Sequence, residues 1–138
     1  MPAGYSGTPL AKKLGMKAGA RVLLVGAPAG FEDELEGLPE GVELTRSGRA
    51  KGPFDVIVYF TASRGALEAA LDGLRGKMTP ACGLWIAWPK KASGVKTDIT
   101  EDVVREVILP TGLVDNKVCA IDATWSGLRV VIRVRDRG

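Results

Sequence analysis

The chain has 138 residues, of which 46% are hydrophobic and 25% charged, and these values predict one soluble globular domain over residues 1–138. The net charge of +3 permits an anionic small molecule as a partner, but it is too small for the clustered basic surface of a dedicated nucleic-acid binder. Histidine is absent, which excludes Ser-His and Cys-His catalytic pairs and the commonest metal ligand, so we expect neither a metal site nor a catalytic residue.

The first third of the chain predicts a short helix and two strands. The helix begins after Thr8, with proline at its first position, and ends at Gly15. The apolar run RVLLVGA at residues 21–27 is typical of a buried parallel strand. A weaker strand, VELTR, is predicted at residues 42–46 after the turn PEG.

The middle of the chain predicts two strong strands that flank an amphipathic helix. β-Branched and aromatic residues fill FDVIVYFT at residues 54–61. Ser63 is the expected N-cap of the helix. Its apolar stripe consists of Leu67, Ala70, Leu71, Leu74 and Met78. The next strand is GLWIAW at residues 83–88, and PKKASG follows it directly.

The last third predicts one more helix and a closing hairpin. Thr100 is the expected N-cap of the helix, and Pro110 ends it. Strands at residues 117–122 and 128–134 are joined by the short turn ATWSG, which makes them antiparallel.

Strands that alternate with helices and end in a hairpin predict an α/β, Rossmann-like, mostly parallel sheet of about six strands. This pattern resembles the sheet of S-adenosylmethionine-dependent methyltransferases, and LGMKAGARVLLVGAP resembles the start of that fold. The resemblance implies the strand order 2-1-3-4-6-5. The link at residues 47–53 is too short for a crossover helix, so we expect an extended bridge and a truncated fold.

The loop VGAPAG at residues 25–30 lies where this fold binds a phosphate or a cofactor. Gly26 and Gly30 match the outer glycines of a G-x-G-x-G pattern, but Pro28 puts a bulky ring without an N–H in place of the middle glycine. The acidic residue expected at the end of the second strand is absent, because that strand ends with Thr45 and Arg46. These departures disfavour S-adenosylmethionine and NAD, and we expect no cofactor.

Ligands of such sheets bind beyond the carboxyl ends of the strands, where the strand order reverses. This rule gathers ten candidate ligand-binding residues, which are Gly26, Pro28, Gly30, Ser63, Arg64, Trp88, Lys90, Lys91, Asp122 and Trp125. Their cations and aromatic rings, with the helix N-terminus at Ser63, predict an anionic, ring-bearing ligand such as a nucleotide. Asp122 is also a candidate general base or partner of Lys90. In the alternative interpretation, the tryptophans pack in the core and the lysines are solvated.

The closing strand alternates basic and apolar residues. Arg129, Val131, Arg133 and Arg135 are expected to face outward, with Val130, Ile132 and Val134 toward the core. An exposed arginine row is either solvated or contacts a partner chain or nucleic-acid phosphates.

Several stretches along nearly the whole chain, above all WPKKASG and TWSGL, resemble a family of short bacterial proteins known only as a domain of unknown function. The resemblance implies an independent cytoplasmic protein and transfers no catalytic residue. The sequence itself also predicts a cytoplasmic protein, because it contains neither a signal-peptide core nor an apolar run long enough to span a membrane. Cys82 and Cys119 are expected to be buried free thiols.

The favoured function is therefore non-catalytic binding of an anionic small ligand or a partner at the carboxyl edge of the sheet, and a homo-oligomer is compatible with it. The first alternative is a minimal S-adenosylmethionine-dependent methyltransferase, with Gly26 to Gly30 cradling the cofactor. The second is a nucleic-acid or protein adaptor that uses the basic last strand.

Overall fold

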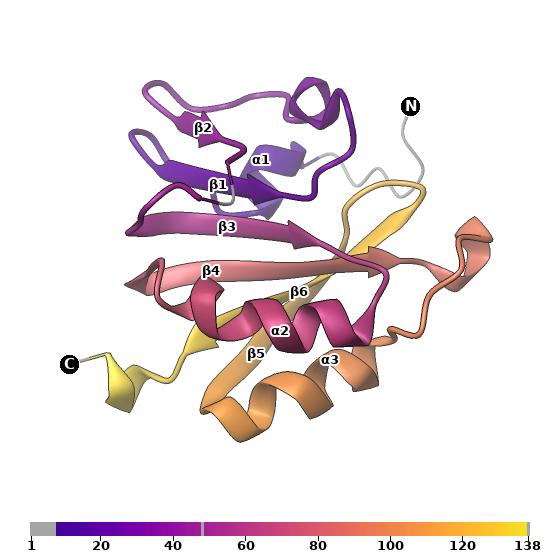
Figure 1. The fold of residues 1–138 in the computed structure, drawn as a ribbon. Helices are drawn as coiled ribbons and strands as arrows, with labels where there is room; N and C mark the ends of the chain where they lie inside the picture. Colours follow the sequence, from indigo (N-terminus) through magenta and orange to yellow (C-terminus); the bar gives the residue numbers. More distant parts are fainter. Residues whose placement is uncertain (1–7, 48, 138) are drawn as a thin grey trace.

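The computed structural model describes residues 8–47 and 49–137, which form a six-stranded sheet with the order β2-β1-β3-β4-β6-β5 (Figure 1). The strands are β1 (Arg21–Val25), β2 (Glu43–Thr45), β3 (Phe54–Phe60), β4 (Met78–Pro89), β5 (Leu113–Ala120) and β6 (Trp125–Ile132). The strands β1 to β4 are parallel to one another, and β6 runs antiparallel to both β4 and β5. The predicted α/β class, strand order and closing hairpin are confirmed.

The two longer helices, α2 (Arg64–Arg75) and α3 (Glu101–Ile108), lie on one face of the sheet (Figure 1). The predicted caps are present, because the hydroxyl of Ser63 accepts a hydrogen bond from the third residue of α2 and that of Thr100 does the same in α3, both at 3.2 Å. The other face carries α1 (Leu10–Lys13) and η1, one 3₁₀ turn at Phe31–Glu34. The first helix differs from prediction in that Pro9 is its N-cap and no side chain caps it.

Each face of the sheet has its own apolar core, because side chains alternate along every strand. Ile57, Leu84 and Ile86 pack beneath α2 and α3, whereas Trp85 lies fully buried on the other face. The indole N–H of Trp85 donates to the carbonyl of Leu14 at 3.0 Å, which fixes the end of α1 to the centre of the sheet.

Three strands begin earlier than predicted. The β5 strand begins at Leu113 and not at residue 117, because its pairing with β6 extends from Leu113 to Ala120. The β4 strand begins at Met78, which the periodicity placed on the preceding helix, because Gly76 ends that helix and Met78 pairs with Phe54 of β3. The β6 strand begins at Trp125 because pairing with β4 continues as far as Pro89. The turn of the hairpin is therefore residues 121–124.

No α-helix lies in the described residues of the links from β1 to β2 and from β2 to β3. The link from β1 to β2 contains only the four-residue η1, and the described residues of the link from β2 to β3, 46–47 and 49–53, form no helix. Ala50 of the second link packs against the core under α2, so an extended bridge replaces a crossover helix as predicted. None of the helices formed by residues 8–47 and 49–137 is both long and apolar enough to cross a membrane.

Candidate functional site

The strand order reverses at the carboxyl end of β1. From β1 the chain goes first to β2 on one side and then to β3 on the other, so the two connections diverge where β1 and β3 end. Open α/β sheets bind their ligands at such switch points. The loop that leaves β1 at this point is Gly26–Gly30, which we call the β1 loop.

The outer glycines of the β1 loop are both exposed and both have a left-handed backbone, with φ of +69° at Gly26 and +79° at Gly30. A Cβ on Gly26 would lie 2.7 Å from the carbonyl oxygen of Phe60, so the approach of β3 requires glycine there. A Cβ on Gly30 would meet only the carboxylate of Asp33, at 3.8 Å. The loop is therefore tight on its β3 side and open at Gly30.

Pro28 closes the turn at the end of the β1 loop. Its carbonyl accepts the N–H of Phe31 at 3.1 Å and an N–H of Arg46 at 2.8 Å. Phe31 is fully buried, so these bonds join the loop to the core beneath η1.

Arg46, the residue after β2, spans the β1 loop with its guanidinium group. Its Nε and Nη2 donate to the two carboxylate oxygens of Glu32 at 2.5 and 2.7 Å. Its Nη1 donates to the carbonyl of Ala27 at 3.0 Å, and Nη2 also donates to Pro28. The hydrogen bond from Arg46 lowers the pKa of Glu32 to about 2. The sequence showed only that this position lacks an acid, since the partners of Arg46 lie 14 to 19 residues away.

Two neighbouring hollows lie at the same edge, on the helix side. One, of about 480 Å³, is lined by Trp88, Pro89, Lys91, Gly94, Val95, Lys96, Thr97, Ile99, Thr100 and Glu101. The other, of about 400 Å³, is lined by Ala62, Ser63, Lys96, Thr97 and Asp98. The structure therefore brings three predicted site residues, Ser63, Trp88 and Lys91, to adjoining hollows, and adds Lys96, which the sequence reasoning missed.

The N-terminus of α2 is already occupied by side chains of the protein. The N–H of Arg64 donates to the carboxylate of Asp98 at 2.7 Å, and the hydroxyl of Ser63 accepts a hydrogen bond from the N–H of Ala66. The guanidinium of Arg64 pairs with Glu106 at 2.9 Å on the side of α3. Arg64 thus joins the two helices, and its charged group does not line either hollow at the edge.

Trp125 lies on the opposite face from Trp88, because it pairs with Pro89, the next residue of β4. Its ring packs edge to face on Phe60 with centroids 5.1 Å apart. Phe60 packs in the same way on Phe31, at 4.9 Å. The two tryptophans that the sequence placed in one cleft are therefore separated by the sheet.

Asp122, in the hairpin turn, accepts the N–H groups of Thr124 and Trp125 at 2.8 Å each. Asp122 interacts with Glu34 of η1, whereas Lys90, its predicted partner, donates its backbone N–H to the carbonyl of Thr124 at 2.7 Å. Glu34 is exposed as a residue, yet partial burial of its carboxyl group, followed by the contact with Asp122, raises the pKa of Glu34 to about 7.

The predicted row of outward arginines is not formed. The β6 strand ends at Ile132, so Arg133 and Arg135 lie beyond it, and Val131 is only 4% exposed. Arg129 lies across Gly83 of β4, where a Cβ would be 2.6 Å from its Nε. The alternation failed as a guide because the strand is shorter than its pattern and is packed on both faces.

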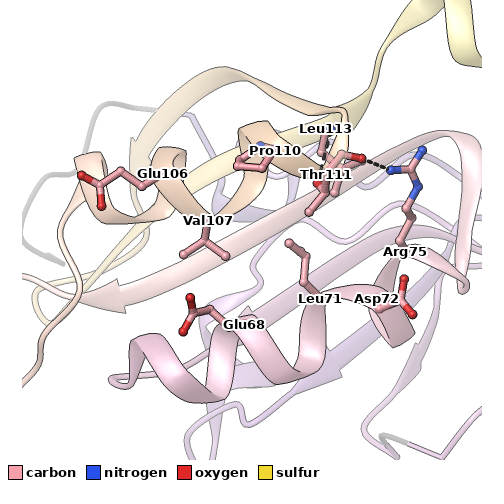
Figure 2. A pocket seen from close by; sticks show the side chains of 9 residues that line it. All are labelled: Glu68, Leu71, Asp72, Arg75, Glu106, Val107, Pro110, Thr111 and Leu113. Atoms are coloured by element: carbon pink, nitrogen blue, oxygen red, sulfur yellow. Dashed lines mark hydrogen bonds between the residues drawn. The ribbon is translucent and has the colours of Figure 1, made fainter.

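The groove between α2 and α3 forms a further hollow of about 540 Å³ (Figure 2). Figure 2 shows the carboxylates of Glu68, Asp72 and Glu106 around it, with Arg75 donating to the carbonyl of Thr111 at 2.5 Å. No residue of the β1 loop lines this groove, so it is separate from the switch point.

Both cysteines are free, as predicted. Cys82 is buried, and burial raises the pKa of its thiol to about 12. Cys119 is half-buried, and burial raises its pKa too. A thiol with a raised pKa is a poor nucleophile near neutral pH.

The fold is similar to solved structures of one class of enzyme. The chain is 17% identical to an S-adenosylmethionine-dependent methyltransferase from Aquifex aeolicus, with a TM-score of 0.64 over 89% of this chain and 88% of that one. It is 13% identical to Aeropyrum pernix fibrillarin with natively bound S-adenosyl-L-methionine, with a TM-score of 0.60 over 90% and 69% of the two chains. It is 11% identical to the magnesium protoporphyrin IX methyltransferase of Synechocystis with bound cofactor, with a TM-score of 0.58 over 89% and 74%.

The fold is therefore that of S-adenosylmethionine-dependent methyltransferases in a truncated form. The sequence matches no protein-family model and no curated protein. The resemblance to a short bacterial family of unknown function thus has no support beyond the motifs on which it rests.

These comparisons contradict two predictions from the sequence. We expected a non-catalytic protein that binds an anionic ligand or a partner, whereas the structures with this fold are methyltransferases. We also expected no cofactor, whereas two of them hold S-adenosylmethionine. The prediction rested on Pro28 and the missing acid, whereas the glycine turn and the switch point, which are backbone features of such sites, are both present.

Proposed function

We propose that the protein is an S-adenosylmethionine-dependent methyltransferase that binds its cofactor at the β1 loop. The observation that carries the proposal is the exposed, left-handed turn at Gly26 beyond β1, at the switch point of a sheet with methyltransferase strand order. Comparable structures named as holding S-adenosylmethionine support the same cofactor here.

The residues around the β1 loop fit such a cofactor. Gly30 has no side chain and is exposed, so a ligand can approach its backbone. Asp33, whose carboxylate is 3.8 Å from the Cβ position at Gly30, would accept hydroxyl groups of a ribose. This assignment gives Asp33 the role that an acid after β2 cannot take in this chain, because Arg46 occupies that position.

The bound cofactor supplies an electrophilic methyl group on a sulfonium ion. The chain would hold the cofactor through the β1 loop and Asp33, and present the acceptor in the hollow beside Trp88. The side chain of Trp88 is only 6% exposed, so it forms an apolar wall there. Lys91 and Lys96 line the same hollow.

Calorimetric titration with S-adenosylmethionine and S-adenosylhomocysteine tests the proposal. We expect both to bind to the wild type, and Gly30→Ala to weaken binding roughly tenfold, or about 1.4 kcal/mol, since its methyl group enters the open side of the loop. Gly15→Ala is the matched control. Its φ is also +79°, and a Cβ there would meet nothing within 4 Å. Absence of heat with either ligand at millimolar concentration would overturn the proposal.

A further inference from the structure

The β1 loop has little secondary structure to hold it. The connection that follows it contains only η1, a single 3₁₀ turn, before the chain reaches β2. A long crossover helix would fix such a loop through its backbone and its packing. Here the loop must be fixed by other contacts.

Arg46 makes those contacts from the far side of the connection. Its four hydrogen bonds join the end of β2 to two carbonyls of the loop and to Glu32 of η1. The side chain of Arg46 is 40% exposed, but the N–H groups of its guanidinium are directed at the loop and at Glu32. Because both carboxylate oxygens of Glu32 are engaged, this acid is not available to a ligand.

The chemistry of this contact is specific to arginine. A guanidinium is planar and can donate to a carboxylate with two parallel bonds while a third nitrogen reaches a carbonyl. A lysine ammonium carries one nitrogen and cannot reach Ala27, Pro28 and Glu32 in this arrangement. The low pKa of Glu32 agrees with a carboxylate that stays ionised against Arg46.

We infer that Arg46 is a positioning residue that holds the β1 loop in its ligand-binding shape, in place of the helix that the truncated fold lacks. The inference rests on the proposed function, because the ligand is the adenosyl cofactor. It adds that Arg46 acts on the ligand only through the loop, whereas Asp33 has the ribose-binding role proposed above.

The test compares Arg46→Ala, Arg46→Lys and the control Arg49→Ala, an exposed arginine of the same link. The affinity for S-adenosylhomocysteine, the melting temperature and amide hydrogen exchange of the full chain are measured. We expect both Arg46 variants to bind roughly tenfold more weakly and to exchange faster at the amides of Phe31 and Asp33, which now donate to Pro28 and Gly30. The melting temperature should fall by only a few degrees, because a partly exposed ion pair contributes little to stability.

The outcomes separate this inference from the proposed function. If the wild type does not bind S-adenosylhomocysteine, the proposed function fails and the inference fails with it. If the wild type binds and Arg46→Ala binds equally well, only the inference fails. Full recovery of binding by Arg46→Lys would also overturn it, because a single charge would then suffice. An Asp33→Ala variant should lose affinity without faster exchange at Phe31.

Discussion

Gly26 and Gly30 have the same left-handed backbone but different surroundings. A Cβ at Gly26 would strike the backbone of β3, whereas one at Gly30 would enter open space beside Asp33. We expect Gly26→Ala to lower the free energy of unfolding by more than the roughly 1–2 kcal/mol of left-handed strain alone. Gly15→Ala introduces only the left-handed backbone strain, so its free energy of unfolding should fall by about that amount. Urea denaturation measures both, and equal losses would contradict the contact with Phe60.

The carboxyl groups of Glu34 and Asp122 predict a pH dependence of stability. The pKa of Glu34 is about 7 in the folded chain and 4.5 ordinarily, so the folded state keeps a proton that the unfolded state releases between these values. Stability should therefore fall as the pH rises from about 5 to about 8. Thermal melts should show a flatter profile for Glu34→Gln and an unchanged one for Glu36→Gln. An identical slope in Glu34→Gln and the wild type would refute the raised pKa of Glu34.

The residues of the site were only partly predictable. Parallel strands end at one edge, so Ser63, Trp88 and Lys91 could be placed together from the order of the elements. The sequence could not show that Trp125 lies on the opposite face, because this depends on pairing of Trp125 with Pro89 in β6 and β4. The role of Arg46 was hidden for a similar reason, since its partners are brought close only by the fold.

At the scale of elements, one buried hydrogen bond docks α1 on the sheet. The indole of Trp85 donates to Leu14, and both residues are almost fully buried. Trp85→Phe leaves that carbonyl without its donor, and we expect a loss of about 1–3 kcal/mol in the free energy of unfolding. Denaturant unfolding that matches the wild type would show that α1 is held by packing alone.

The ion pairs of Arg64, one within α2 and one with α3, should contribute less to stability than this buried hydrogen bond. Arg64 joins Glu68 and Glu106, but all three side chains are substantially exposed. We expect Arg64→Ala to lower stability by at most about 1 kcal/mol, since exposed pairs are weak. Because the guanidinium pairs with Glu106 and Arg64 lines neither hollow at the edge, cofactor affinity by calorimetry should stay within about twofold of the wild type. A larger loss of affinity would indicate that Arg64 is a ligand-binding residue, as the sequence predicted.

The elements themselves were mostly predictable from local chemistry. Apolar runs gave the central strands, and Ser63 and Thr100 gave the starts of α2 and α3. The strand starts that were predicted wrongly, now at Met78, Leu113 and Trp125, were extended by pairing with other strands. Met78 has the spacing of the apolar stripe of α2, but it pairs with Phe54 of β3 and is therefore part of β4.

At the scale of the whole molecule, the chain keeps the sheet of a methyltransferase and shortens its connections. The sheet order was predictable from the alternation of elements and the closing hairpin. The proposed cofactor was not predicted, since Pro28 and Arg46 suggested a lost site, whereas the folded backbone has the switch point. In this chain only the 3₁₀ turn η1 follows the β1 loop, and the side chain of Arg46 contacts the loop from the end of β2.

The most direct test of cofactor binding at the β1 loop is a titration of isotopically labelled protein with S-adenosylhomocysteine, followed by backbone amide chemical shifts. We predict saturable shifts at Gly26, Gly30 and Asp33, with little change in the α2–α3 groove of Figure 2. Shifts confined to that groove, or no saturable shift at millimolar ligand, would contradict the account.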